Sequence, residues 1–237
     1  EALRTRRSGL KRYEARRDFA ADVDGPALDT WIGEVEGLQS IKLPEPLSRY
    51  DCRNNRLAWL GLQQDEFVAK ARAAVARYGS ARVAVLIGTS TSGIEQAESA
   101  YRARDAAGHL PQSFSYPTTL NNFSAPALVA HAVGATGPTF AISTACSSSA
   151  KVFAAAARLM RADWIDAAIV GGVDSLCLTT LCGFSALELL SRDPCRPFDR
   201  ARSGISIGEG AGFALLEARA DAPAYLLGAG ESSDAHH

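Results

Sequence analysis

The residue best suited to chemistry in this chain is Cys146, which lies between a predicted strand and a predicted helix. Thr139–Ser143 is short and largely apolar, which is typical of a buried strand, and Ala150–Met160 has the composition of a helix. Backbone N–H groups at a helix N-terminus lack internal partners, and the helix dipole there favours negative charge. We therefore expect Cys146 to ionise readily and to act as a nucleophile.

The neighbours of Cys146 are small, which leaves room for a substrate: Ala145, Ser147 and Ser148. The alternative is that Cys146 packs as a small hydrophobic residue, because cysteine is among the most buried residue types. The local sequence leaves both interpretations open.

Composition and charge restrict the classes of function. The chain has 237 residues, enough for one large domain or two small ones, and 47% of them are hydrophobic, as in ordinary globular proteins. The 25 basic and 26 acidic residues give a net charge of −1, so no nucleic-acid partner is expected. Apolar runs such as Val83–Ile87 are too short to span a bilayer, and the opening residues do not indicate secretion.

The cysteine pattern does not predict disulfides or a metal site. Five cysteines stand at positions 52, 146, 177, 182 and 195, with irregular spacing and no Cys-x-x-Cys pair. The histidines at 109, 131, 236 and 237 form no metal-ligand pattern with them. We therefore expect free thiols in a reducing cytoplasm.

Strand and helix patterns alternate after residue 81 and predict an α/β fold with a layered sheet. Strands are expected at Arg82–Gly88, Pro138–Ser143, Ile165–Val173, Gly210–Ala218 and Ala224–Gly228. Helices are expected over Arg53–Tyr78, as two helices meeting near Leu62–Asp65, and over Gly93–Ala107, Asn121–Val133 (interrupted by Pro126) and Thr179–Leu190.

Three further segments carry less information. Residues 1–17 are basic, as an ordinary solvated surface can be, and residues 20–50 are mostly loop, with a short helix near Leu28–Val35. Gly208–Gly212 precedes a strand, whereas a dinucleotide cradle follows a strand and opens a helix. We interpret these glycines as residues of tight turns or close backbone approach.

Seven stretches, in this order, resemble those of the β-ketoacyl-acyl carrier protein synthases, condensing enzymes of the thiolase superfamily. They are Gly137-Pro138 with Ser143–Ser148, Val170–Ser175, Gly183–Ala186 with Leu190-Ser191, Arg196–Asp199, Arg202–Gly204, Gly208–Gly212 with Leu216-Glu217, and Gly228–Gly230 with Ser232–Ala235. Together they cover most of the chain from Ala81 onward. The resemblance implies a thiolase-like layered αβαβα fold and identifies Cys146 as the nucleophile.

The resemblance also implies parts that these residues do not include. Family members begin with a strand before Glu1–Leu10 and continue beyond Ser233, where two catalytic histidines and a glycine-rich oxyanion segment follow. We therefore expect residues 1–237 to be the N-terminal half of a synthase, without the first strand and the C-terminal half. His236 and His237 fall in a stretch that varies in the family and are not expected to be catalytic.

The implied activity is that of a 3-oxoacyl-acyl carrier protein synthase, an acyltransferase of fatty acid, polyene or polyketide synthesis. Cys146 would take an acyl group from its carrier, and malonyl-carrier protein would then condense with it after losing carbon dioxide. No metal or organic cofactor is expected, because decarboxylation supplies the driving force, and the phosphopantetheine arm arrives on the carrier. The expected partners are acyl carrier protein and an identical or related synthase subunit in a dimer.

The resemblance also suggests binding residues. The segment Thr118–Phe123 corresponds to the floor of the acyl pocket near the dimer partner, so Leu120, Asn121 and Phe123 are candidates for limiting acyl length, and Phe184 is a further candidate. A basic rim for the acidic carrier protein would include Arg49, Arg53, Arg56 and Arg202. The alternatives are core packing for the pocket candidates and solvated arginines without a partner.

Two other functions stay open. The first is a non-catalytic partner like the chain-length-factor subunits, which usually lack the cysteine. The second is a coenzyme A-dependent thiolase, against which the matches at Arg196–Asp199 and Gly208–Gly212 favour the carrier-protein branch. The stretch Tyr50–Arg56 departs from housekeeping fatty acid synthases and suggests a specialised pathway such as aryl polyene synthesis.

Overall fold

The structure is a computed structural model that describes residues 8–13, 28–218 and 221–234. The chain forms two compact units, each assembled from three separate stretches of sequence. Unit 1 comprises Glu1–Leu57, Thr91–Ser124 and Asp174–Gly210, and unit 2 comprises Ala58–Ser90, Ala125–Val173 and Ala211–His237. Helices and strands alternate along the chain, so the α/β class is confirmed.

Unit 2 is built on a four-stranded sheet. Its strands are β3 (Val83–Gly88), β4 (Thr139–Ile142), β5 (Ala167–Asp174) and β7 (Gly210–Glu217), in the order β4-β3-β5-β7. The central strand β3 pairs in parallel with β4 and β5. Every residue of β3 is buried, as its unbroken apolar run predicted, because both faces of a parallel sheet are covered by helices.

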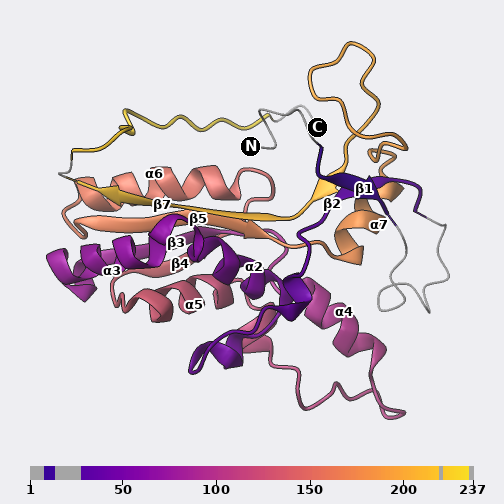
Figure 1. Ribbon diagram of the computed structural model, residues 1–237, viewed down its shortest axis with the longest axis horizontal. Coiled ribbons are helices and arrows are strands. Elements are labelled where there is room, and N and C mark those ends of the chain that lie inside the picture. Colours follow the sequence, from indigo (N-terminus) through magenta and orange to yellow (C-terminus); the bar gives the residue numbers. More distant parts are fainter. Residues whose placement is uncertain (1–7, 14–27, 219–220, 235–237) are drawn as a thin grey trace. The chain divides into compact units, whose positions relative to one another are not determined.

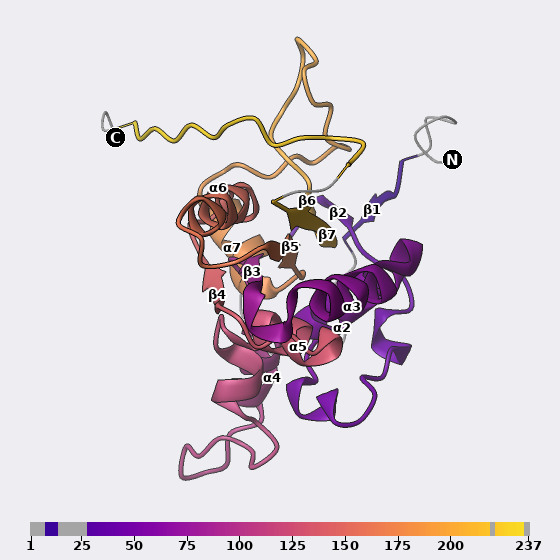
Figure 2. The same ribbon diagram turned by 90° about the vertical axis from the view of Figure 1, so that its left-hand side faces the viewer.

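Helices cover both faces of this sheet. α6 (Ser148–Arg161) lies on one face, and α3 (Phe67–Tyr78) and α5 (Ser124–Val133) lie on the other (Figures 1 and 2). Leu86 and its neighbours on alternate strand positions pack against Val152 and Ala156 of α6, because side chains alternate across a strand. No helix in the described part of the chain is both long and apolar enough to cross a bilayer.

Unit 1 contains a three-stranded sheet of β1 (Leu10–Arg12), β2 (Trp31–Gly33) and β6 (Ile207–Gly208). β2 pairs antiparallel with β1 and parallel with β6. The predicted helix near Leu28–Val35 is therefore wrong. Ile32 is buried against Leu176 and Leu181, which are distant in sequence, and this packing outweighs the local pattern.

The remaining elements mostly match the sequence pattern. They are η1 (Leu38–Ser40), η2 (Leu47–Tyr50), α2 (Arg53–Leu62), η3 (Gln64–Glu66), η4 (Ser80–Arg82), α4 (Ile94–Arg102), η5 (Tyr116–Leu120, a π-helical turn) and α7 (Leu178–Ala186). The predicted junction of two helices is confirmed, because Asp65 and Glu66 adopt positive φ angles and end the helical path. Pro126 does not interrupt α5, because it lies in the first turn, where a missing N–H costs no helical bond.

The predicted strand at Ala224–Gly228 is wrong. These residues have no sheet pairing among the described residues and run beside α6 (Figure 1). They line a groove of about 520 Å³ together with residues of α6 and β7. Glu231, just beyond them, forms ion pairs with Lys151 (3.7 Å) and Arg158 (3.0 Å) of α6. These ion pairs hold the segment along the helix.

Two glycines allow the ends of β3 and β5 to touch the start of α6. A Cβ at Gly88 would lie 2.4 Å from the backbone nitrogen of Ser149, and a Cβ at Gly172 would lie 2.5 Å from the Cβ of Ser149. Real Cβ atoms do not approach other atoms so closely, so any side chain would displace the helix. By contrast, a Cβ at Gly210 or Gly212 would meet nothing within 4 Å, so close approach does not explain these two glycines.

We expect Gly88→Ala to lower the free energy of unfolding by about 1–3 kcal/mol, because the added methyl overpacks the contact with Ser149. Urea unfolding measures the change. Gly212→Ala, in β7 of the same unit, is the matched control and should be close to wild type, since its methyl meets open space. Equal stability of the two variants would contradict the close contact at Gly88.

Candidate active site

Cys146 occupies the turn between β4 and α6, two residues before the helix begins at Ser148, as predicted. Its side chain is exposed, so the buried packing considered from the sequence is not what the structure shows. The preceding residue, Ala145, has a φ of 51°, a left-handed conformation that residues other than glycine seldom adopt. This tight turn presents the thiol at the N-terminal end of α6.

Two hydroxyl groups that follow Cys146 bond to the backbone that precedes it and hold the turn. The Ser148 hydroxyl accepts a hydrogen bond from the Thr144 N–H (2.8 Å) and donates to the Ala145 carbonyl (2.6 Å). The Ser147 hydroxyl donates to the Thr144 carbonyl (2.9 Å). The unusual conformation of Ala145 is thus fixed by short-range bonds, and the position of the thiol does not depend on a long flexible loop.

All five cysteines are free, and Cys52 and Cys177 differ from Cys146 in being buried. Burial raises the pKa of Cys52 to about 12 and also raises the pKa of Cys177, whose sulfur lies 3.1 Å from the Thr180 hydroxyl. Both thiols therefore stay protonated and unreactive near neutral pH. Cys182 is exposed on α7, and Cys195 is partly buried.

Among the described residues, no group of three or more His, Cys, Asp and Glu side chains could hold a metal ion. The two described histidines have other partners: His109 pairs with Asp105 (3.1 Å), and His131 contacts the Ala127 carbonyl (2.8 Å). His236 and His237 lie outside the described residues.

The four acyl-pocket candidates lie in unit 1, whereas Cys146 lies in unit 2. Leu120 is half-buried at the end of η5, and the side-chain oxygen of Asn121 accepts the Phe123 N–H (3.0 Å). Phe123 is 53% exposed, and Phe184 is half-buried in α7. The structure therefore places Leu120, Asn121 and Phe123 in one turn and Phe184 on a separate helix.

Three of the four docking candidates are at least partly accessible. Arg49 is exposed, and its guanidinium lies over the Tyr50 ring at 4.9 Å. Arg202 is exposed and donates to the Asp199 carbonyl (3.1 Å). Arg56 is partly buried and forms a two-pronged ion pair with Asp51 at 2.6 and 2.7 Å, so its charge is already partly neutralised.

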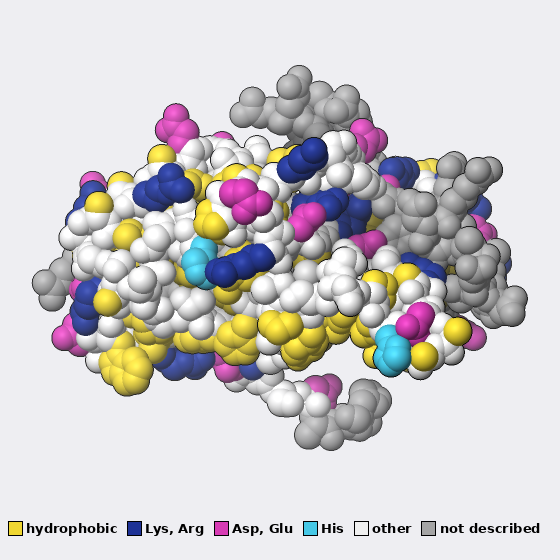
Figure 3. All heavy atoms as spheres, turned by 90° about the horizontal axis from the view of Figure 1, so that it is seen from below, with side chains coloured by type: hydrophobic (Ala, Val, Ile, Leu, Met, Phe, Trp, Pro, Cys, Tyr) yellow, Lys and Arg dark blue, Asp and Glu magenta, His cyan; other side chains and the backbone are white. Residues whose placement is uncertain are grey.

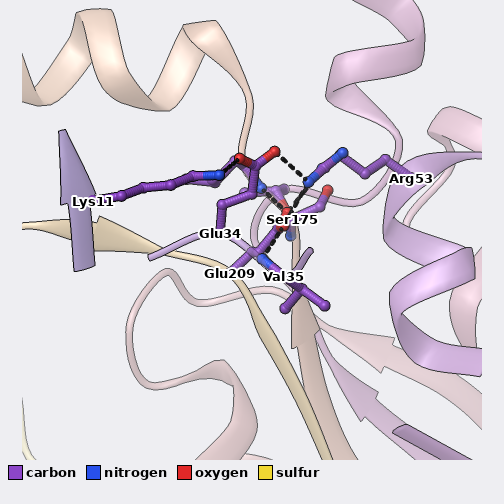
Figure 4. A network of polar contacts seen from close by, with 8 residues as sticks. Lys11, Glu34, Val35, Arg53, Ser175 and Glu209 are labelled. Atoms are coloured by element: carbon purple, nitrogen blue, oxygen red, sulfur yellow. Dashed lines mark hydrogen bonds and ion pairs between the residues drawn. The ribbon is translucent and has the colours of Figure 1, made fainter. Parts of the chain in front are cut away.

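Arg53 does not fit the predicted docking surface, because its side chain is only 7% exposed. It donates twice to Glu209, through Nε (2.8 Å) and Nη2 (2.5 Å), and Nη2 also contacts Glu34 at 3.2 Å (Figure 4). Lys11 pairs with the other oxygen of Glu34 at 2.6 Å. Arg53 is therefore part of an internal ion-pair network of unit 1, and the docking prediction for it is wrong.

Glu209 is the centre of this network and was not predicted from the sequence. Its side chain is 0% exposed, and it also accepts the N–H groups of Val35 (2.9 Å) and Leu176 (3.0 Å). Both oxygens therefore have two donors each, which satisfies a carboxylate that would otherwise be costly to bury. The signal in the sequence is a charged residue between the glycines of the 208–212 stretch.

The structural class is that of a layered α/β unit that carries an exposed cysteine on a strained strand-to-helix turn. Comparison with known proteins defines the family. The sequence profile described as "Beta-ketoacyl synthase, N-terminal domain" matches residues 54–222. The chain therefore belongs to the β-ketoacyl synthase family.

The relatives that match this chain include nodulation proteins and 3-oxoacyl-[acyl-carrier-protein] synthases. Nodulation protein E of Rhizobium meliloti is 29% identical, over 99% of this chain and 61% of the relative. The chloroplastic 3-oxoacyl-[acyl-carrier-protein] synthase I of Hordeum vulgare is 36% identical, over 66% of this chain and 37% of the relative. The chain thus spans less than two thirds of the length of these curated relatives.

Solved structures agree with this assignment. The ketosynthase ApeO, in complex with its chain length factor ApeC from Xenorhabdus doucetiae, is 30% identical with a TM-score of 0.74, covering 90% of this chain and 51% of that chain. A β-ketoacyl synthase from Burkholderia phymatum has a TM-score of 0.70 at 20% identity, which supports the fold alone.

We expect Arg53→Met to lower the free energy of unfolding by about 3–5 kcal/mol, because it leaves Glu209 buried without its cation. Adding Glu209→Gln should restore part of the loss, since the amide oxygen still accepts N–H bonds and carries no charge. The control Arg202→Met, on an exposed arginine, should change stability by no more than about 0.5 kcal/mol in the same unfolding measurement. Wild-type stability of Arg53→Met would rule out the structural role.

Proposed function

We propose that this chain supplies the nucleophile-bearing part of a 3-oxoacyl-acyl carrier protein synthase, which performs a decarboxylative Claisen condensation. The observation that carries the proposal is the exposed Cys146 thiol on its strained turn before α6, in a member of the β-ketoacyl synthase family. In this proposal residues 1–237 form the N-terminal half of the synthase, and the downstream half completes the active site.

In the first half-reaction, the Cys146 thiolate attacks the thioester carbonyl of an acyl-carrier protein. A carbon–sulfur bond forms to Cys146, and the carrier's phosphopantetheine thiolate leaves. The negative charge on the carbonyl oxygen of the tetrahedral intermediate is stabilised by backbone N–H donors, one of them from Cys146. The hydroxyl bonds that fix Thr144 and Ala145 hold this N–H in place before the substrate arrives.

In the second half-reaction, malonyl-carrier protein loses carbon dioxide and becomes an enolate. The enolate carbon attacks the acyl carbonyl on Cys146, a carbon–carbon bond forms, and the Cys146 thiolate leaves. The product is a 3-oxoacyl group on the carrier, and decarboxylation makes the condensation favourable. Groups of the downstream half would stabilise the enolate.

We further propose a dimer with an identical or related subunit. The structure of ApeO is that of a ketosynthase in complex with its chain length factor. In this chain, β4 pairs only with β3 among the described strands, so one edge of the sheet is open. Large apolar side chains are exposed in the described part of the chain, including Trp164, Leu187, Phe198 and Leu227. Apolar side chains also gather in a band on the face that Figure 3 shows. Exposed apolar surface of this kind favours burial against further protein.

The first test is acyl loading of Cys146 in the synthase that contains this chain. After incubation with acyl-carrier proteins of several lengths, intact-protein mass spectrometry should show one acyl group on the wild type. Cys146→Ala should carry none, whereas Cys182→Ala, which removes another exposed thiol, should load normally. Failure of the wild type to load any acyl group would favour a non-catalytic, chain-length-factor-like role.

The second test concerns carrier docking. Arg49→Glu and Arg202→Glu should raise KM for acyl-carrier protein about tenfold and leave kcat nearly unchanged, because rim charges act on encounter with an acidic partner. Arg104→Glu is the matched control: this arginine also lies over a neighbouring tyrosine ring, at 5.2 Å, and changes the net charge equally. Equal KM values for all three variants would remove Arg49 and Arg202 from the docking surface.

A further inference from the structure

Along the chain, the charge nearest to the nucleophile is that of Lys151. The stretch 135–150 contains no charged residue, and Lys151 lies in the first turn of α6, where its N–H donates to the Ser147 carbonyl (3.1 Å). Two extended residues span at most about 7 Å, and residues three apart on a helix lie about 5–6 Å apart, so Cys146 and Lys151 are separated by no more than about 13 Å. The charge of Lys151 therefore acts on the thiol.

This charge is opposed by Glu231, a residue of the segment that runs beside α6 (Figure 1). The Lys151 ammonium lies 3.7 Å from Oε2 of Glu231, and Oε1 of Glu231 lies 3.0 Å from Nη2 of Arg158. Lys151 and Arg158 are seven residues apart, so they share one face of α6 at a separation of about 10 Å along its axis. One carboxylate thus bridges a cation close to the nucleophile and a cation two turns further along, all within unit 2.

The bridge is open to solvent and can be released. The side chains of Lys151, Glu231 and Arg158 are 36%, 40% and 59% exposed. Ion pairs exposed to this degree are weak and are screened by salt. Residues 221–234 form no backbone–backbone hydrogen bond with α6 in the described part of the chain. The segment that carries Glu231 can therefore leave the helix, and Lys151 then loses its counter-ion.

The strands that pack against α6 bring few other charges. β3 and β4 carry none. The other acidic residues on the neighbouring elements are Asp174 of β5, Glu217 of β7, and Asp221 and Asp234 of the segment 221–234. Asp174 accepts the Thr91 N–H (2.8 Å), and Glu217 accepts a bond from Arg77 (3.1 Å). Lys151 and Glu231 are therefore the pair to vary.

We propose that Lys151 and Glu231 act on the reaction through Cys146, because their opposite charges set how readily its thiol reacts. The Lys151 cation favours the thiolate, which is the form that attacks, and the positive end of α6 acts in the same direction. The Glu231 carboxylate opposes both. Release of Glu231 raises the reactivity of Cys146, and its return lowers that reactivity. The inference rests on the proposed function in one respect, since attack by this thiolate is the first half-reaction.

The test measures alkylation of Cys146 by iodoacetamide in the synthase that contains this chain. The reaction is run near neutral pH and at about 0.01 M salt, where the screening length is about 30 Å. Mass spectrometry of the peptides gives the rate at each thiol, so Cys182, an exposed thiol of unit 1, is an internal control in every sample. The variants are Lys151→Met, Glu231→Gln and the double variant. Arg158→Met is the matched control, because it removes the other cation paired with the same carboxylate.

Relative to Cys182, Cys146 should react about threefold more slowly in Lys151→Met and about threefold faster in Glu231→Gln. The double variant should return close to the wild-type rate, because both opposing charges are gone. Arg158→Met should also stay close to wild type, since this cation lies two turns further from the thiol. Wild-type rates in both single variants overturn the inference, and so does an equal loss in Lys151→Met and Arg158→Met.

Salt and pH separate an effect of charge from an effect of structure. At about 1 M salt the screening length falls to about 3 Å, so the rates of all variants should converge. They should also converge at alkaline pH, where Cys146 is a thiolate whatever its neighbours are. Differences that persist under both conditions would show altered access to the thiol and would overturn the inference.

Acyl loading distinguishes this inference from the proposed function. Equal alkylation rates in all variants, together with normal acyl loading of Cys146, overturn the inference and leave the proposed function intact. Absent loading in the wild type, with alkylation rates that still follow the charges, overturns the proposed function and leaves the effect of Lys151 and Glu231 on the thiol standing.

Discussion

The contact between the ends of β3 and β5 and the first turn of α6 determines where the nucleophile lies. Gly88 and Gly172 bring two strands of the sheet against Ser149, and Cys146 stands three residues earlier. The helix cannot move outward without exposing Val152 and Ala156, which are buried against the sheet. The thiol is therefore positioned by the most buried part of unit 2, and the strained Ala145 is tolerated because its surroundings are rigid.

Unit 1 depends on a different kind of interaction, a buried carboxylate. Glu209, directly after β6, connects three other segments of unit 1. It bonds to Val35 after β2, to Arg53 at the start of α2 and to Leu176 after β5. Unit 1 also buries apolar side chains, including Ile32, Leu176 and Leu181, which pack together. The charged network makes the packing of unit 1 more specific, because each hydrogen bond requires one particular donor at one position.

Local patterns predicted the elements that depend on local sequence. The apolar run of β3, the two helices of Arg53–Tyr78 and the strand-to-helix turn at Cys146 were all evident from periodicity and composition. The strand β2 and the unpaired segment 224–228 were not, because contacts with Leu176 and ion pairs of Glu231 decide them. The sequence shows that Arg53 is charged, but it does not show that Glu209, 156 residues later, lies opposite it. Which residues so far apart in sequence contact each other is known only from the folded chain.

The two units are interleaved along the polypeptide, and this affects synthesis. Each consists of three stretches, and the outermost strand of the four-stranded sheet, β7, ends only at Glu217. Neither unit can close before its third stretch has been made, which begins at Asp174 in unit 1 and at Ala211 in unit 2. Parallel strands separated by long crossovers form slowly in any case. Nascent chains of this protein therefore expose apolar strands until these stretches have been made, and their yield in a cell should depend strongly on chaperones.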